Sequence, residues 1–283
     1  MTIINYYLLT KPGILLGNLV TTAAGFLLAS KGIIDFWLFF TVLMGLTCIM
    51  ASGCVFNNYI DRTLDKKMER TKNRALVIGL ISGRNALFFA LILGILGNLI
   101  LYVYTNYLTV FIADIGLFVY AVLYSLWKSR TIYGTAIGSI AGAIPPIVGY
   151  CAVSNHFDMG ALIFFTMMTF WQMPHFFSIA LLHFKDYTAA GIPVLPIEKG
   201  ILVTKIHMVI YISSFILAAV MLTLFKYTGY WYLVIVTTLG FSWLLLCIKG
   251  FSSKDDQAWG RHMFRLSLIL INATCFTIPF DTL

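Results

Sequence analysis

Charged residues are scarce in this sequence. Asp, Glu, Lys and Arg make up 11% of the 283 residues, whereas hydrophobic residues make up 60%. A soluble domain of ordinary composition carries about 25% charged residues, so this chain does not fit that class. The composition predicts an integral membrane protein whose surface contacts the lipid bilayer.

Cysteine is also rare. The five cysteines lie within or near apolar segments and form no CxxC pair: Cys48, Cys54, Cys151, Cys247 and Cys275. This spacing argues against a disulfide framework and against a cysteine zinc site. We interpret these residues as small members of a packed interior.

Apolar runs of about 20 residues, the length that spans a bilayer as a helix, are abundant. They lie near residues 13–30, 36–58, 84–104, 107–127, 134–153, 159–184, 203–224, 229–249 and 263–280. The first run has no strong basic region before it and no convincing cleavage site, so we interpret it as a helix and not as a signal peptide. The expected fold class is all-α: one domain over residues 1–283, with nine transmembrane helices around a central cavity that opens to the cytoplasmic side.

The net charge of +8 is concentrated on one side of this predicted membrane protein. Of the 19 lysines and arginines, all except Lys31 and Lys226 lie near the N-terminus or near the connections after even-numbered segments. By the positive-inside rule, the N-terminus and these connections face the cytoplasm, and the C-terminus lies outside. We expect a location in a bacterial inner membrane and no nucleic-acid partner.

Asn57, Asp61 and Asp65 form an oxygen-rich ladder at the end of the second apolar run. Because they are four residues apart, a helix places them on one face over about 12 Å. Mg²⁺ prefers carboxylate oxygens together with water and phosphate oxygens, and the Asn57 amide could orient such a ligand. The alternative is a hydrated helix end, where Asp61 and Asp65 repel each other mildly. At the end of a membrane span, we expect a magnesium-diphosphate site.

Basic side chains follow this ladder and the fourth apolar run. They are Arg70, Lys72, Arg74, Lys128 and Arg130. Arginine binds two phosphate oxygens at once, so such a cluster suits a diphosphate. Tyr124 and Lys128 are also four residues apart and share a helix face. The alternative is that these cations only set the membrane orientation.

A polar block, Trp171-Gln172-Met173-Pro174-His175, interrupts the sixth apolar run. Pro174 removes a helical hydrogen bond and is expected to kink the helix. Polar groups at membrane depth are costly and usually functional. Imidazole is a common axial ligand of haem iron, although His175 could instead form a hydrogen bond between helices. Asp186 follows the same run and could add a carboxylate to the metal site.

The fifth apolar run contains Gly138 and Gly142, a spacing that indicates close packing between membrane helices. Pro145-Pro146 is predicted to break this run before its far end. Asp114 lies in the fourth run, and the sequence suggests no role for it.

The stretch from Asn57 to Arg74 resembles the first aspartate-rich motif of the UbiA superfamily of intramembrane prenyltransferases. The stretch from Tyr124 to Lys128 resembles its YxxxK element. Four further stretches resemble the branch that farnesylates protohaem IX: residues 10–13, 133–146, 171–175 and 185–193. The resemblance covers nearly the whole chain, and its specificity comes from the combination of these motifs.

This resemblance implies Mg²⁺-dependent transfer of a farnesyl group from farnesyl diphosphate to a vinyl group of haem b, with addition of water to give haem O. The implied metal ligands are Asn57, Asp61, Asp65 and Asp186, and the implied catalytic residues are Asp61, Asp65, Tyr124 and Lys128. The implied diphosphate ligands are Arg70, Lys72, Arg74, Lys128, Arg130 and Lys185. The implied haem contacts are Trp171, Gln172 and His175. Haem b is then a substrate, and Mg²⁺ is the expected cofactor.

One position departs from the superfamily pattern. Relatives that prenylate aromatic acids have a second DxxxD motif, whereas here the residue four positions before Asp186 is Leu182. The ligands of a second magnesium ion are therefore not predicted.

Three other functions stay open at the level of sequence. Leu182 and the Trp171–His175 block argue against prenyl transfer to a quinone or aromatic precursor. A secondary transporter would explain Pro145 and Pro174, because transporters often contain broken helices. A haem-binding structural subunit would have no use for the acidic ladder. The resemblance also implies a terminal oxidase as downstream user of the product, and leaves open self-association or assembly with that oxidase.

Overall fold

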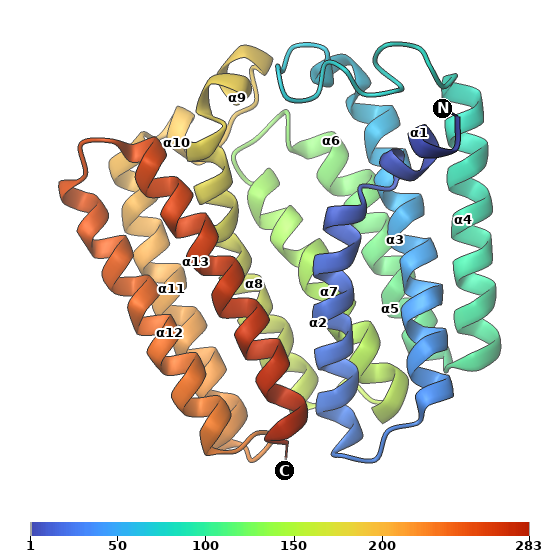
Figure 1. The fold of residues 1–283 in the computed structure, drawn as a ribbon, viewed down its shortest axis with the longest axis vertical. Helices are drawn as coiled ribbons and strands as arrows, with labels where there is room; N and C mark the ends of the chain where they lie inside the picture. The colour runs from blue at the N-terminus through green and yellow to red at the C-terminus, as the bar shows by residue number, and fades with distance from the viewer. Residues whose placement is uncertain (1, 283) are drawn as a thin grey trace.

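Long helices run side by side between the two ends of the molecule (Figure 1). The computed structural model describes residues 2–282. The long helices are α2 (Pro12–Ser30), α3 (Phe36–Asp65), α4 (Gly83–Tyr104), α5 (Tyr107–Phe118), α7 (Gly134–Ser154), α8 (Met159–Leu182), α11 (Ile201–Leu224), α12 (Tyr230–Lys249) and α13 (Asp256–Thr277). Short elements are α1 (Thr2–Leu9), η1 (Val119–Tyr124), α6 (Ser125–Trp127), α9 (Phe184–Ala190), α10 (Leu195–Glu198), η2 (Gly250–Ser252) and η3 (Ile278–Phe280).

Eight helical stretches within residues 2–282 are long and apolar enough to cross a membrane, so the prediction of an all-α membrane protein is confirmed. One of these stretches, from Tyr107 to Trp127, joins α5, η1 and α6. The helix α8 is not among the eight, although it is 24 residues long. It carries the polar residues Gln172 and His175 together with Pro174 near its middle.

Side-chain caps define where several of the long helices begin. A capping carboxylate, hydroxyl or amide oxygen accepts a backbone N–H that has no partner within the helix. The capping residues are Asp35, Ser82, Asn106, Asp158 and Asp255. Four of these five helices begin within a residue of the start predicted from the apolar run, and the exception is the helix capped by Asp255.

The helix α7 lies near the centre of the bundle and packs against α2, α5 and α8. Its crossing with α2 is close, because a Cβ atom at Gly25 would lie 1.9 Å from Pro146 O. The predicted break at Pro145-Pro146 is wrong, since α7 continues through both residues to Ser154. Packed neighbours keep such a helix in place although its prolines donate no hydrogen bond.

Two element boundaries and one connection differ from the prediction. The second span continues as a helix to Asp65, and the last one begins at Asp256 instead of near residue 263. The cause is the same at both places, because polar residues continue the helix beyond the apolar run that was used to find it. The third difference is that the connection after α8 contains the short helices α9 and α10.

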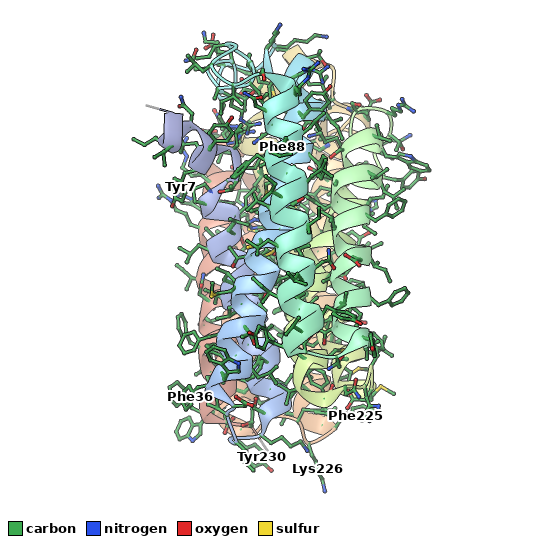
Figure 2. The ribbon with its side chains drawn as sticks, turned by 90° about the vertical axis from the view of Figure 1, so that its right-hand side faces the viewer. Tyr7, Phe36, Phe88, Phe225, Lys226 and Tyr230 are labelled. Carbon is green, nitrogen blue, oxygen red and sulfur yellow. The ribbon has the colours of Figure 1, made fainter. Side chains whose placement is uncertain are left out.

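Apolar side chains cover the outside of the bundle, as expected of a protein in lipid (Figure 2). Phe88 projects from α4 and is 65% exposed, and Phe36 and Tyr230 lie near the lower end of the same view. The connections that carry most of the cations gather at the upper end with α1, whereas Lys226 lies at the opposite end. The molecule therefore has one strongly basic end and one with little positive charge.

Candidate active site

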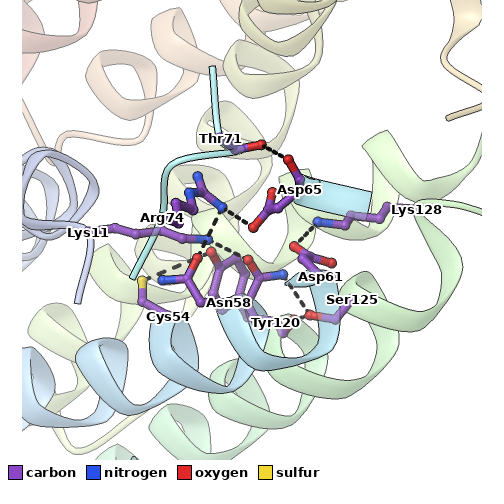
Figure 3. Close-up of polar contacts among 11 residues, drawn as sticks. Lys11, Cys54, Asn58, Asp61, Asp65, Thr71, Arg74, Tyr120, Ser125 and Lys128 are labelled. Carbon is purple, nitrogen blue, oxygen red and sulfur yellow. Dashed lines mark hydrogen bonds and ion pairs between the residues drawn. The ribbon is translucent and has the colours of Figure 1, made fainter. Parts of the chain in front are cut away.

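The acidic ladder lies on the last turns of α3 and is buried, and Figure 3 shows Asp61 and Asp65 with the cations that pair with them. Asn57, Asp61 and Asp65 are 1%, 3% and 2% exposed. Lys128 donates to Asp61 Oδ2, and Arg74 donates to Asp65 Oδ2 over 2.7 Å. Buried carboxylates need such partners because an isolated buried charge is costly. The ladder therefore faces cations, and the interpretation as a hydrated helix end does not hold.

Lys11 completes this cluster, although the sequence pattern assigned it no role. Its Nζ donates to Asn57 Oδ1, and Asn57 Nδ2 donates to Ser125 Oγ over 2.8 Å. Lys11 has φ 54° and ψ 64°, a left-handed conformation that is uncommon for residues with a Cβ atom. Burial lowers the pKa of the Lys11 ammonium to about 8. Two sequence signals pointed to it, namely a cation directly before Pro12, the first residue of α2, and its place in the stretch 10–13 that carries part of the family resemblance.

The connection between α3 and α4 folds back over the ladder. The Arg74 guanidinium also donates to Asn58 Oδ1 over 3.1 Å, and Thr71 Oγ1 donates to Asp65 O over 3.0 Å. Arg70, from the same connection, reaches the cavity that the ladder faces. This fold brings two of the predicted phosphate-binding arginines to the carboxylates.

Three of the predicted phosphate ligands lie elsewhere. Lys72 is 46% exposed and pairs with Glu69 over 2.5 Å. Arg130 and Lys185 are exposed, and none of these three residues lines the cavity. They lie in polar connections, where nothing buried holds their long side chains and water is the better partner.

Asp186 is also separated from the ladder. It lies in α9, and its Oδ1 accepts the backbone N–H of Glu69 over 3.1 Å, which ties α9 to the connection after α3. Among the described residues, no group of three or more His, Cys, Asp and Glu side chains is placed to hold a metal ion. The next residue, Tyr187, lines the cavity instead, and burial raises the pKa of its phenol to about 12.

One carboxylate oxygen of the ladder is unsatisfied. Asp61 Oδ1 is buried and has no hydrogen-bond partner in the part of the chain that the structure describes. Leaving a buried acceptor without a partner costs about 1–3 kcal/mol. Carboxylate oxygens are the ligands that Mg²⁺ prefers, so this atom and its neighbour Asp65 fit such an ion.

A π-helical segment shapes the next part of the site. The segment η1 interrupts the fourth span over Val119–Tyr124, and Ser125 Oγ donates to Tyr120 O over 3.1 Å. The rings of Tyr120 and Tyr124 stack with centroids 5.7 Å apart, and Lys128 Nζ lies 5.3 Å from the Tyr124 centroid. Such π segments often occur at functional sites, and the apolar pattern of the sequence did not reveal this one.

The polar block of α8 lies deeper in the bundle. Trp171 and His175 stack with ring centroids 4.7 Å apart, and His175 Nδ1 lies 2.8 Å from Ser267 Oγ of α13. Gly142 of α7 leaves room for the Gln172 amide, because a Cβ atom there would lie 2.2 Å from Gln172 Oε1. At Gly138 a Cβ atom would lie 2.9 Å from the Tyr124 ring, so the predicted close packing is confirmed at both glycines.

One cavity of about 610 Å³ joins these groups. Its lining includes the acidic ladder, the cations Lys11, Arg70, Arg74 and Lys128, the tyrosines of η1, and Trp171, Gln172 and His175. The rest of the lining is mainly apolar and comes from α2, α3, α5, α7, α8 and α13. The cavity is therefore charged at one end and apolar and aromatic over the remainder.

Residues 18–269 match the UbiA prenyltransferase family. A protoheme IX farnesyltransferase of Protochlamydia amoebophila (strain UWE25) is 59% identical over 98% of this chain and 99% of its own length. A protoheme IX farnesyltransferase of Yersinia enterocolitica is 51% identical over 99% of this chain and 95% of its own length.

Solved structures share the fold at low sequence identity. The structure of a digeranylgeranylglyceryl phosphate synthase superposes with a TM-score of 0.81 at 18% identity and covers 98% of this chain and 97% of its own. A UbiA homolog from Archaeoglobus fulgidus bound to DMAPP and Mg²⁺ gives a TM-score of 0.76 at 15% identity, covering 98% of this chain and 99% of its own.

Proposed function

The chain belongs to the UbiA prenyltransferase family, and from this we propose that it transfers a farnesyl group from farnesyl diphosphate to a vinyl group of haem b. Two relatives named protoheme IX farnesyltransferase, 59% and 51% identical over nearly the full chain, support this choice of substrates. The observation that carries the proposal is the shared cavity, in which carboxylates and cations at one end meet an apolar region with His175.

The residues of the ladder fit Mg²⁺ as the cofactor of this reaction. Asp61 and Asp65 would hold the ion, with the Asn57 amide orienting a water ligand or a carboxylate. Asp186 would join only after leaving the Glu69 N–H that it now accepts. When bound, the ion would neutralise negative charge on the diphosphate.

The cations around the ladder would stabilise the leaving group. The bond between the farnesyl carbon and the diphosphate oxygen breaks, so negative charge builds up on the diphosphate. Lys128 and Arg74 are partly buried beside the carboxylates, where such stabilisation is stronger than in water, and the exposed Arg70 reaches the same cavity from the connection after α3. Lys11 brings a fourth cation to the same end.

The apolar part of the cavity would hold the farnesyl chain and the acceptor. The aromatic faces of Tyr120, Tyr124 and Trp171 can stabilise a cation-like allylic carbon. A new carbon–carbon bond then forms to the haem vinyl group. Water adds its oxygen to the other vinyl carbon and releases a proton, which gives a hydroxyethylfarnesyl side chain.

For the membrane arrangement, we propose a single domain with nine spans, α8 included, in a bacterial inner membrane. The basic end of the bundle would face the cytoplasm, and the C-terminus would lie outside. The positive-inside rule and the position of Lys226 opposite the other connections support this orientation. The cavity would then receive a water-soluble diphosphate head from the cytoplasmic side.

The direct test is an assay of the purified protein with haem b, farnesyl diphosphate and Mg²⁺, read by mass spectrometry. We expect farnesylated haem from the unmodified protein and at least a 100-fold loss in Asp61→Asn, in Asp65→Asn and after chelation of Mg²⁺, because each removes transition-state charge stabilisation. Asp114→Asn is the matched control, since Asp114 is exposed on α5 and does not line the cavity. Prenylation of an aromatic acceptor instead of haem would refute the substrate assignment, and solute flux without any covalent product would favour a transporter.

A further inference from the structure

Aromatic rings from two helices pack against the His175 imidazole. The Trp171 indole stacks on one side with ring centroids 4.7 Å apart and an interplanar angle of 22°. The Phe264 ring lies with its centroid 5.1 Å from that of the imidazole, tilted by 31°. Trp171 and His175 belong to α8 and Phe264 belongs to α13, so the packing of two helices limits how the imidazole can turn.

Ser267 determines which ring nitrogen of His175 carries the proton. Ser267 Oγ donates its hydrogen to Phe264 O over 2.6 Å, as serine often does within a helix. A hydroxyl has one hydrogen, so towards His175 Nδ1, 2.8 Å away, the same oxygen can only accept. Nδ1 must then be the donor, and the neutral imidazole carries its lone pair on Nε2.

Trp171 forms a hydrogen bond to the backbone carbonyl of the same serine. The indole Nε1–H donates to Ser267 O over 3.0 Å, so Ser267 is bound through both its carbonyl and its hydroxyl. Ser267 is fully buried, which protects these hydrogen bonds from exchange with water. The three residues therefore form one interlocked contact between α8 and α13.

The other ring nitrogen is available to a ligand. His175 lines the cavity, and within residues 2–282 Nε2 takes part in no hydrogen bond and no carboxylate pairs with the ring. A haem propionate would need a hydrogen-bond donor at Nε2, which this tautomer does not offer. A metal ion needs a lone pair, and Nε2 of this tautomer has one.

We infer that Ser267 is a positioning residue that holds His175 with Nδ1 protonated, so that Nε2 is the axial ligand of the haem iron. This inference rests on the proposed function, because it takes haem b as the molecule in the cavity. A hydrogen bond from Nδ1–H to an acceptor orients a ligating imidazole and makes its free nitrogen a better donor to the metal. The haem is thereby held by its iron while its edge reacts.

The test uses the purified full-length protein with haem b and no farnesyl diphosphate, so that no turnover occurs. Optical titration gives the Kd for haem, and resonance Raman spectra of the ferrous complex give the iron–imidazole stretch. We expect His175→Gly to lose this stretch and to recover it when imidazole is added. We expect Ser267→Ala to bind haem about 10-fold more weakly, with a lower stretching frequency, and Ser267→Thr to restore both.

Ser178→Ala is the matched control. Ser178 is a buried serine of α8 whose hydroxyl donates to Pro174 O over 2.7 Å, and it does not line the cavity. We expect this variant to bind haem with the same Kd and the same iron–imidazole stretch as the unmodified protein. A loss equal to that of Ser267→Ala would mean that any buried serine has this effect, and would overturn the positioning role.

Two results would overturn the inference itself. One is the absence of an iron–imidazole stretch from the haem complex of the unmodified protein. The same conclusion follows if His175→Gly without added imidazole has the same haem spectrum as the unmodified protein. The other is a Ser267→Ala variant with an unchanged Kd and an unchanged stretch. Product formation is measured separately by mass spectrometry, so farnesylated haem from a protein without the imidazole signal refutes this inference alone. The imidazole signal without any farnesylated haem refutes the proposed reaction alone.

Discussion

Single residues of this site are held by partners that are distant in the sequence. Lys11 adopts a left-handed backbone, which costs roughly 1–2 kcal/mol for a residue with a Cβ atom. The hydrogen bond from its ammonium to Asn57 compensates for this cost and places a fourth cation beside the acidic ladder. Strained residues cluster at functional sites, and Lys11 lines the cavity.

The pKa of Lys11 leads to a prediction about pH. Because burial lowers this pKa to about 8, Lys11 is mostly charged at pH 7 and mostly neutral at pH 9. The positive charge of Lys11, which would bind the diphosphate, is therefore lost as the pH rises through 8. We expect the KM for farnesyl diphosphate to increase about 10-fold or more above that pH. Initial-rate kinetics between pH 6.5 and 10 will measure this rise.

Lys11→Arg is the control, because a guanidinium stays charged across this range. Its KM should show no rise around pH 8, whereas Lys11→Ala should have a raised KM at every pH. A KM of the unmodified protein that stays constant up to pH 10 would contradict a charged role for Lys11.

At the scale of elements, the contact between α2 and α7 depends on glycine. A Cβ atom at Gly25 would overlap Pro146 O, and one at Gly149 would lie 2.1 Å from Thr22 O. Backbone atoms cannot move aside as a flexible side chain can, so the helices approach this closely only without side chains at these points. This contact also explains how α7 stays continuous through its two prolines.

We therefore expect Gly25→Ala to lower the free energy of unfolding by about 1–3 kcal/mol, because α2 and α7 must separate. Thermal unfolding of the purified protein in detergent measures the effect. Gly17→Ala is the control on the same helix, since a Cβ atom there has no neighbour within 4 Å. Equal melting temperatures for both variants would show that the close crossing does not limit stability.

At the scale of the whole molecule, the two ends differ in charge and the chain termini lie at opposite ends (Figure 1). The proposed orientation can be tested with single cysteines at Lys254, in the connection between η2 and α13, and at Lys226, at the other end. Both side chains are exposed. A membrane-impermeant maleimide should label Lys254→Cys in inverted vesicles and Lys226→Cys in right-side-out vesicles. Labelling of both from the same side would refute the topology, and the unmodified chain gives the background of its own cysteines.

Much of the fold follows from local patterns. A run of about 20 apolar residues is enough to indicate a membrane helix, and capping residues such as Asp35 and Asp158 mark where helices start. The ladder of Asn57, Asp61 and Asp65 could be placed on one face because its spacing matches the helical repeat. Prediction failed where the decisive signal is not apolar, as in the polar first turns of α13 and the π segment of Val119–Tyr124.

A membrane-embedded helical protein with an acidic ladder and a polar block in α8 can be read from the amino-acid order alone, because these features depend on residues within a few turns of one another. Which side chains meet depends on the packing of the helices in three dimensions. It brought Lys11 to Asn57 and Ser267 to His175, and it left Lys72, Arg130 and Lys185 outside the cavity. These two contacts join residues 46 and 92 positions apart, and they depend on how whole helices pack against each other, which the local pattern does not specify.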